Sequence, residues 1–173
     1  GLFLLTPEGA LGGMLHVLFH ATIKVCLFLV AGSIIHNTGK TNVDEFDGIG
    51  KAMPKTLWAF TFAALALIGI PPASGFVSKW YLALGALDSG MAVYSWLTPV
   101  VLLISALLTA GYLLPVTVRG FFPGKDAVLP PKNDEGGWGM VAPIWILAAL
   151  TLLLGLCAGS MLGAMESLTA SLF

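Results

Sequence analysis

Three basic side chains recur at helical spacing within the first apolar stretch of the chain. His16, His20 and Lys24 stand at positions i, i+4 and i+8, so a helix would hold them within roughly 80° of one another, on one stripe. Imidazole accepts a proton at one nitrogen while it donates from the other, and a desolvated lysine amine can load and unload a proton. A single histidine of this kind could serve only as a hydrogen-bond partner of a neighbouring helix. Three basic groups on one stripe favour a proton path.

A fourth basic residue, Lys79, follows an interruption in the second apolar stretch. Prolines in the run Gly69-Ile-Pro-Pro-Ala-Ser-Gly75 lack an N–H, and with the flanking glycines they should unwind a helix. Backbone groups freed within a membrane are tolerated only where they are buried in protein or hydrated. We therefore expect a site for water and hydroxyl groups beside Lys79, formed by Pro71, Pro72, Ser74, Gly75 and Ser78. The alternatives are a simple proline kink and, for Lys79, an interfacial anchor beside Trp80.

The composition requires that lipid solvates most of the surface around these residues. Of the 173 residues, 57% are hydrophobic and 10% are charged, with a mean hydropathy of +0.92. A soluble domain carries about 25% charged residues. We therefore predict an all-α fold, a polytopic transmembrane helical bundle.

Four apolar stretches reach the roughly 20 residues that span the hydrocarbon core of a bilayer. We expect helices at about 11–35, 93–118 and 140–165, and one helix broken at Pro71-Pro72 that joins 57–69 to 75–88. A straight helix through the whole second stretch would be about 46 Å long, too long for the core, and each half alone is too short.

Charge distribution favours a single broken pass over two separate passes. With one pass, all basic loop residues fall on one side, opposite the acidic residues Glu8, Asp88 and Glu166. These basic residues are Lys40, Lys51, Lys55, Arg119, Lys125 and Lys132. By the positive-inside rule, loops 36–56 and 119–138 should be cytoplasmic.

Several other classes of function lack support in the sequence. Cys26 and Cys157 have no ligand spacing and are expected to be small apolar side chains, so we predict no metal site. No nucleotide- or cofactor-binding motif and no nucleophile arrangement occurs, so we expect no cofactor and no catalysis by the chain alone. A net charge of −1 without a basic patch excludes nucleic acid as an expected partner.

Two runs of residues resemble motifs of one membrane-protein family. The run from His16 through Lys24 to Gly32 resembles the H-xxx-H-A-xx-K-xx-L-F-L-xx-G helix of proton-conducting antiporter-like subunits. The run Gly69-Ile-Pro-Pro-Ala-Ser-Gly-Phe-Val-Ser-Lys79 resembles the G-[ILF]-P-P-xx-G-F-x-[SG]-[KE] segment of the same family. The motifs stand in the family's order, about 50 residues apart, and the resemblance covers roughly residues 10–120. The family includes the large antiporter-like subunits of complex I, Mrp-type Na⁺/H⁺ antiporters and membrane-bound hydrogenases.

The resemblance implies a role for each basic residue. Lys24 would be the central lysine of a hydrophilic axis along the membrane midplane, and His16 and His20 would link that axis to its neighbours. Lys79 would be the terminal lysine beside the broken helix, exchanging protons with one side of the membrane. In some members this last position is a glutamate.

The resemblance also implies that the chain is the second half of an inverted-repeat antiporter-like fold. A full member has a first repeat with an acidic residue and another lysine, for which residues 1–173 offer no counterpart. Because the sequence also opens at Gly1 without an initiator Met or a signal pattern, we expect a C-terminal part that lacks the N-terminal repeat. Such a part should not pump protons by itself.

The expected function is proton translocation, or Na⁺/H⁺ exchange, within a multisubunit antiporter or a redox-driven pump of the NADH:quinone oxidoreductase or hydrogenase type. The expected partners are the lipid bilayer of a prokaryotic cell membrane, other membrane subunits, and the missing N-terminal repeat. The alternative is a non-conducting structural subunit whose polar residues form interhelical hydrogen bonds. The sequence leaves open which complex hosts the chain, whether Na⁺ moves, and which electron donor is used.

Overall fold

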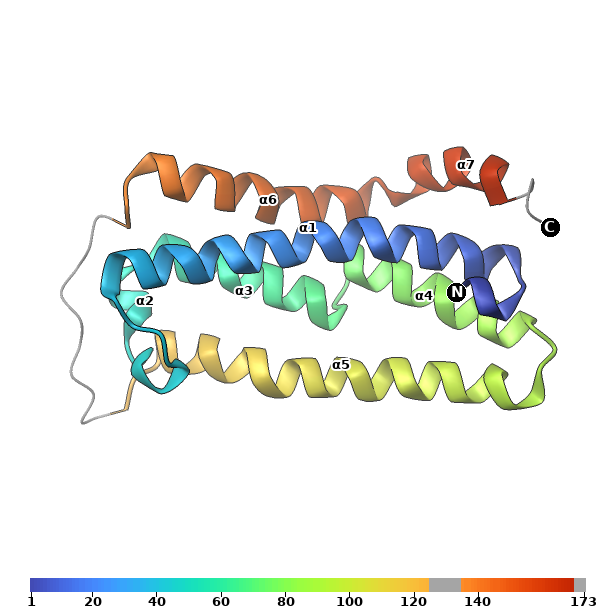
Figure 1. The fold of residues 1–173 in the computed structure, drawn as a ribbon, viewed down its shortest axis with the longest axis horizontal. Coiled ribbons are helices and arrows are strands. Elements are labelled where there is room, and N and C mark those ends of the chain that lie inside the picture. Colours follow the sequence, from blue (N-terminus) through green and yellow to red (C-terminus); the bar gives the residue numbers. More distant parts are fainter. Residues whose placement is uncertain (125–134, 170–173) are drawn as a thin grey trace.

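The computed structural model describes residues 1–124 and 135–169, and within these ranges all regular secondary structure is helical, without a strand (Figure 1). The helices are η1 (Leu2–Leu4), α1 (Pro7–Thr38), η2 (Val43–Glu45), α2 (Ile49–Ala52), α3 (Pro54–Ile68), α4 (Ser74–Asp88), α5 (Ala92–Phe121), α6 (Trp138–Leu156) and α7 (Ala158–Thr169). The prediction of an all-α bundle is confirmed.

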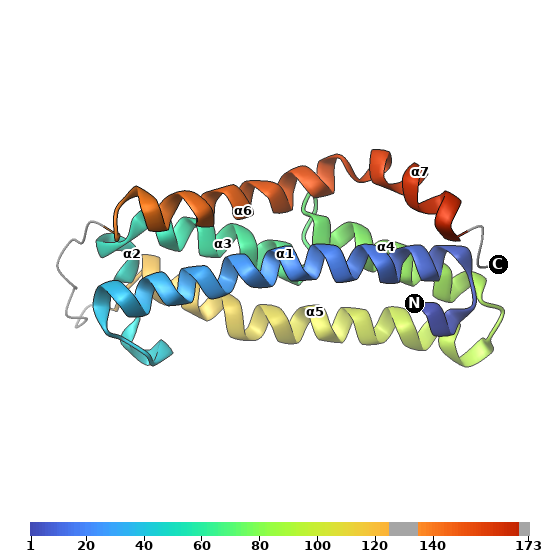
Figure 2. The same cartoon turned by 45° about the horizontal axis from the view of Figure 1, so that its top comes forward.

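Three of these helices are long and apolar enough to cross a membrane. They are α1, α5 and α6, whose most apolar windows have mean hydropathies of 2.0, 2.1 and 2.2. The shorter helices α3 and α4 follow one another end to end, as do α6 and α7, so each pair runs along the same length as α1 and α5 (Figures 1 and 2). The chain is an integral membrane protein whose helices run parallel and antiparallel to one another.

The chain reversals gather at the two ends of this elongated bundle. At one end, the Arg119 Nη1 lies 2.6 Å from Asp44 Oδ1, and the Gly48 N–H donates to the Arg119 carbonyl over 3.1 Å. The start of α1 and the turn between α4 and α5 lie at the opposite end (Figure 1). Lys125 and Lys132, which also belong to the predicted basic loops, lie outside the described residues.

Capping interactions fix where α1 begins and ends. The Thr6 hydroxyl oxygen accepts from the Gly9 N–H over 3.2 Å and donates to the Gly85 carbonyl over 3.0 Å, so it caps α1 and joins it to α4. At the other end, Gly39 adopts φ 68°, the left-handed conformation that favours glycine after a helix. The hydrogen bond from Thr6 to Gly85 sets the start of α1 in register beside α4.

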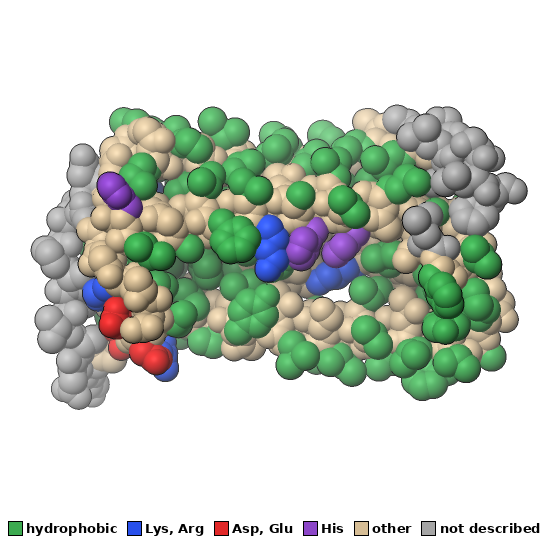
Figure 3. All heavy atoms as spheres, viewed as in Figure 1, with side chains coloured by type: hydrophobic (Ala, Val, Ile, Leu, Met, Phe, Trp, Pro, Cys, Tyr) green, Lys and Arg blue, Asp and Glu red, His purple; other side chains and the backbone are tan. Residues whose placement is uncertain are grey.

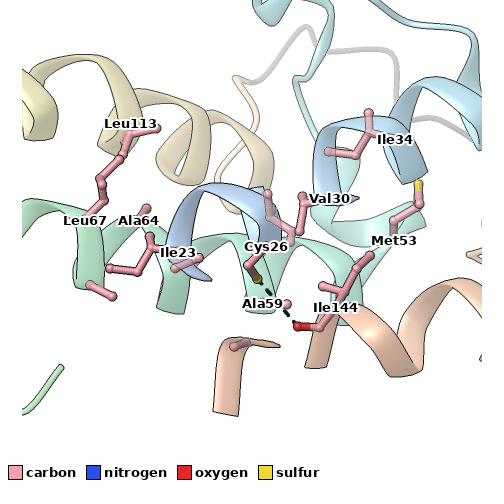
Figure 4. Packing of buried hydrophobic residues seen from close by; sticks show 14 of the residues in the cluster. Ile23, Cys26, Val30, Ile34, Met53, Ala59, Ala64, Leu67, Leu113 and Ile144 are labelled. Carbon is pink, nitrogen blue, oxygen red and sulfur yellow. Dashed lines mark hydrogen bonds between the residues drawn. The ribbon is translucent and has the colours of Figure 1, made fainter. Parts of the chain in front are cut away.

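One face of α1 packs into the main apolar core against α3 and α6 (Figure 4). Cys26 belongs to this core, and its thiol donates to the Ile144 carbonyl over 3.5 Å. The α1 residues of this core are Ile23, Cys26, Val30 and Ile34. Cys157, in contrast, is exposed, and both cysteines are free thiols.

The helix expected at 140–165 is instead divided: α6 ends at Leu156 and α7 begins at Ala158. Just before the break, α6 meets the backbone between α3 and α4. A Cβ at Gly155 would overlap the Pro72 carbonyl oxygen and lie 2.7 Å from the Ser74 nitrogen. The interruption of α6–α7 therefore lies against the interruption of α3–α4, a tertiary contact between segments more than 80 positions apart.

Candidate functional site

A small cleft of about 90 Å³ brings together the four basic residues of the two motifs. Its lining residues come from four helices: His16, His20 and Lys24 of α1, Leu67 of α3, Lys79 of α4, and Ser105, Thr109 and Tyr112 of α5. Figure 3 shows these basic side chains as a row midway along one face, bordered by hydrophobic side chains, whereas the acidic side chains visible on that face gather at one end. Within the described part of the chain, no acidic residue lines this cleft.

The two histidines form a connected pair within the cleft. Their ring centroids are 5.3 Å apart with an interplanar angle of 33°. The Nδ1 of His16 lies 3.0 Å from the Ser78 hydroxyl oxygen, and which of the two donates depends on the tautomer of the ring. Helical spacing on α1 and one contact to α4 therefore place the side chains of His20, His16 and Ser78 next to one another in a row.

Lys79 binds the end of the neighbouring half-helix. Its Nζ donates to the carbonyl oxygens of Leu67 and Ile68 over 3.0 and 2.8 Å, and these are the last two residues of α3. The final carbonyls of a helix have no partner within the helix and carry partial negative charge, so an ammonium group is favourable there. Gly69 permits this approach, because it adopts φ 96° and a Cβ there would lie only 3.3 Å from Nζ.

The residues of the predicted hydration site differ in their burial and in their distance from the cleft. Ser78 contacts the cleft residue His16, and Ser74 and Gly75 are buried beside it in the chain. The Ser74 hydroxyl has no hydrogen-bond partner among the described residues. Pro71 and Pro72 are exposed and do not line the cleft. A water site at this interruption remains a prediction.

Sequence reasoning did not identify the polar residues that α5 contributes. Ser105, Thr109 and Tyr112 line the cleft opposite the basic stripe of α1. Their spacing of i, i+4 and i+7 is the same kind of helical periodicity that singled out the stripe on α1. That signal could have found them.

Glu135 is a second residue that the sequence did not single out. It is only 4% exposed, and its carboxylate accepts from the Lys55 N–H over 3.2 Å and from the Thr56 N–H and hydroxyl, each over 2.8 Å. These partners lie about 80 positions away in the chain. A local reading of a polar, Pro- and Gly-rich loop cannot reveal such a contact.

No group of histidine, cysteine and carboxylate side chains within the described ranges could hold a metal ion. The chemistry that the cleft offers is that of imidazoles, amines and hydroxyls, all of which can pass protons by hydrogen bonding.

Comparisons with known proteins agree with the family resemblance of the sequence. The family model described as "NADH:quinone oxidoreductase/Mrp antiporter, TM" matches residues 1–109. The chain is 40% identical over 156 residues to NADH-quinone oxidoreductase subunit N of Desulforudis audaxviator, a match that covers 84% of this chain and 30% of that protein. It is 33% identical over 151 residues to a Na(+)/H(+) antiporter subunit of Bacillus subtilis, covering 87% of this chain and 30% of the relative.

A solved structure shares the fold. A chain in the structure of the Mrp complex from Dietzia sp. superposes with a TM-score of 0.70 at 26% identity, covering 95% of this chain and 38% of that one. The chain thus spans about 30% of the length of the curated relatives named above. Since the family model matches more than half of it, the chain belongs to the NADH:quinone oxidoreductase/Mrp antiporter transmembrane family.

Proposed function

We propose that this chain is part of a membrane subunit that translocates protons within a multisubunit antiporter or a complex I-like assembly. The observation that carries the proposal is the cleft in which four basic side chains from two helices meet three hydroxyl-bearing side chains of α5. An intramembrane ionisable residue is costly enough to indicate function, and here four of them share one site. Because the chain spans about 30% of its curated relatives, the activity belongs to the whole subunit.

In this proposal Lys24 and Lys79 are the two proton-binding stations. Two ammonium groups that share a small cleft repel one another, and the repulsion is strong where water is scarce. Loading one lysine with a proton therefore favours release from the other. Through this repulsion, a change of charge at one lysine would move a proton at the other lysine.

The histidines provide the connection between the stations. His20 and His16 are close enough to share protons through one intervening group, and His16 reaches the Ser78 hydroxyl directly. Lys79, held at the interruption between α3 and α4, would exchange protons with one side of the membrane.

We propose protons rather than Na⁺ as the cargo of this cleft. Hard cations such as Na⁺ prefer carboxylate and carbonyl oxygens, whereas the cleft's described lining is basic and would repel them. In an antiporter-type host, Na⁺ would therefore cross elsewhere. The partners in the proposal are lipid and the other membrane subunits of the host, in a prokaryotic cell membrane with loops 36–56 and 119–138 on the cytoplasmic side.

The test replaces Lys24 or Lys79 with alanine in the full-length protein within its complex. Loss of a proton-transferring group should lower proton flux per assembled complex by about a hundredfold or more. The matched control is Lys51→Ala, which removes an exposed lysine at the end of the bundle and should leave flux unchanged. Near-normal flux in both test variants would contradict the proposal and favour a non-conducting structural subunit.

A further inference from the structure

The short helix α3 is bound at both ends by charged side chains from other segments. The carboxylate of Glu135 lies at its first turn, and the amine of Lys79 lies at its last. Negative charge at the N-terminus and positive charge at the C-terminus are the arrangement that the helix dipole favours. With 15 residues, α3 separates the two groups by about 22 Å.

Glu135 completes the hydrogen bonding of the α3 N-terminus. The preceding residue, Met53, provides no side-chain cap, and Pro54 at the first position has no N–H to satisfy. The next two amides, of Lys55 and Thr56, both donate to the Glu135 carboxylate, and the Leu57 amide already donates to the Met53 carbonyl. Every amide of this turn that lacks a backbone partner is therefore bound by one side chain.

The segment that carries Glu135 is held tightly against α3. Glu135 itself adopts φ 57°, a conformation that residues other than glycine rarely occupy unless surrounding contacts impose it. A few residues later, the Trp138 ring lies 5.3 Å from the Lys55 Nζ. Two independent contacts thus fix the start of α6 onto the start of α3.

We propose that Glu135 is a positioning residue for Lys79 and acts through α3. The carboxylate fixes the axial position of α3 and complements its dipole, and α3 in turn presents the Leu67 and Ile68 carbonyls to the Lys79 amine. A helix transmits an axial displacement because each turn is hydrogen-bonded to the next. The consequence for transport rests on the proposed role of Lys79, whereas the structural coupling does not.

The test uses Glu135→Gln in the full-length protein within its complex, with hydrogen exchange as the first measurement. A glutamine has one acceptor oxygen and an NH2 group that only donates, so at least one of the three donors loses its acceptor and the cap is weakened. We expect amide exchange to rise about tenfold at Lys55 and Thr56 and also at Gly69 and Ile70, at the far end of α3. A rise confined to Lys55 and Thr56 would show that Glu135 only anchors the loop, and would overturn the inference.

Proton flux is the second measurement, normalised to the amount of assembled complex. Displacement of the carbonyls that hold Lys79 should lower flux about tenfold, since small misplacements at a reacting group cost this much or more. Unchanged flux together with raised exchange at Gly69 and Ile70, in a complex where Lys79→Ala abolishes flux, would overturn the positioning role. If Lys79→Ala itself transports normally, the proposed function fails, while the exchange measurement still decides whether the two ends of α3 are coupled.

Two further variants keep the test decisive. Should Glu135→Gln fail to assemble, Thr56→Ala removes one of the three hydrogen bonds and keeps the carboxylate. It should raise exchange at both ends of α3 by a smaller factor, and a rise at the first turn alone would again contradict the coupling. The matched control is Glu45→Gln, which removes an exposed carboxylate in the loop after α1 and should change neither measurement.

Discussion

Two faces of one helix, α1, have opposite properties. On one face, Phe19, Ile23 and Cys26 are almost wholly buried and meet apolar neighbours from other helices. On the adjoining face, His16, His20 and Lys24 are partly exposed and line a cleft with Lys79. The residues alternate along the sequence, so a helix that is apolar on average carries a packing face and a basic face.

Close packing and proton chemistry therefore lie on different sides of the same helix. The apolar face stabilises the fold through close packing, whereas the basic face is unfavourable by about 2.5–3.5 kcal/mol for each lysine placed at mid-membrane. Substitutions on the two faces should therefore affect different measurements. The apolar face should determine stability, and the basic face should determine flux.

The largest effect on stability is expected from Phe19→Ala. Phe19 has no exposed surface, so its truncation should lower the free energy of unfolding by about 3–5 kcal/mol through lost contacts and a cavity. The measurement is denaturation of the complex, with flux per surviving complex expected to remain normal. Phe19→Leu, which keeps most of the volume, should cost less. Equal stability of Phe19→Ala and wild type would mean that this face does not pack as described.

Local sequence features predict the basic face well. The i, i+4, i+8 spacing alone places His16, His20 and Lys24 on one stripe, and the prolines and glycines at 69–75 indicate an interruption before Lys79. The same periodicity applied to α5 would also have found Ser105 and Thr109. These features could be predicted because each depends only on residues within a few turns.

An intermediate effect is expected from Gly155→Ala. The added methyl group would meet backbone atoms of residues 72–74 that cannot rotate away, so unfolding should become easier by about 1–3 kcal/mol. Gly159→Ala is the matched control, because nothing lies within 4 Å of the Cβ that it adds. Alanine is the better helix former, so helix propensity alone would not destabilise either variant. A destabilisation that is the same for both glycines would therefore show that the contact between the two interruptions is not responsible.

Features that depend on contacts between distant segments could not be predicted from the sequence. The division between α6 and α7 lies beside the close approach of Gly155 to the backbone near Pro72, more than 80 positions away. The contact of Glu135 with Thr56 spans 79 positions. No local periodicity encodes either contact, because both arise only when the helices assemble.

The smallest effect is expected from Ser78→Ala, a change on α4 at the residue that contacts His16 of the basic face. The change removes the hydroxyl that lies 3.0 Å from His16 Nδ1, so it should lower stability by about 0.5–1.5 kcal/mol and slow flux less than tenfold. Ser89→Ala, which removes a hydroxyl bonded to Ala86 at the end of α4, should leave flux unchanged. If both serine variants slow flux equally, the His16 contact has no special role.

The most direct test of the account compares two positions of α1 that are two residues apart and lie on different faces. Proton flux per assembled complex would be measured for Lys24→Met, which removes the amine but keeps a long side chain, and for Cys26→Ala. We expect a loss of flux by about a hundredfold for Lys24→Met with normal assembly, and normal flux with a modest loss of stability for Cys26→Ala. Equal flux in the two variants would contradict the assignment of proton transfer to the basic face.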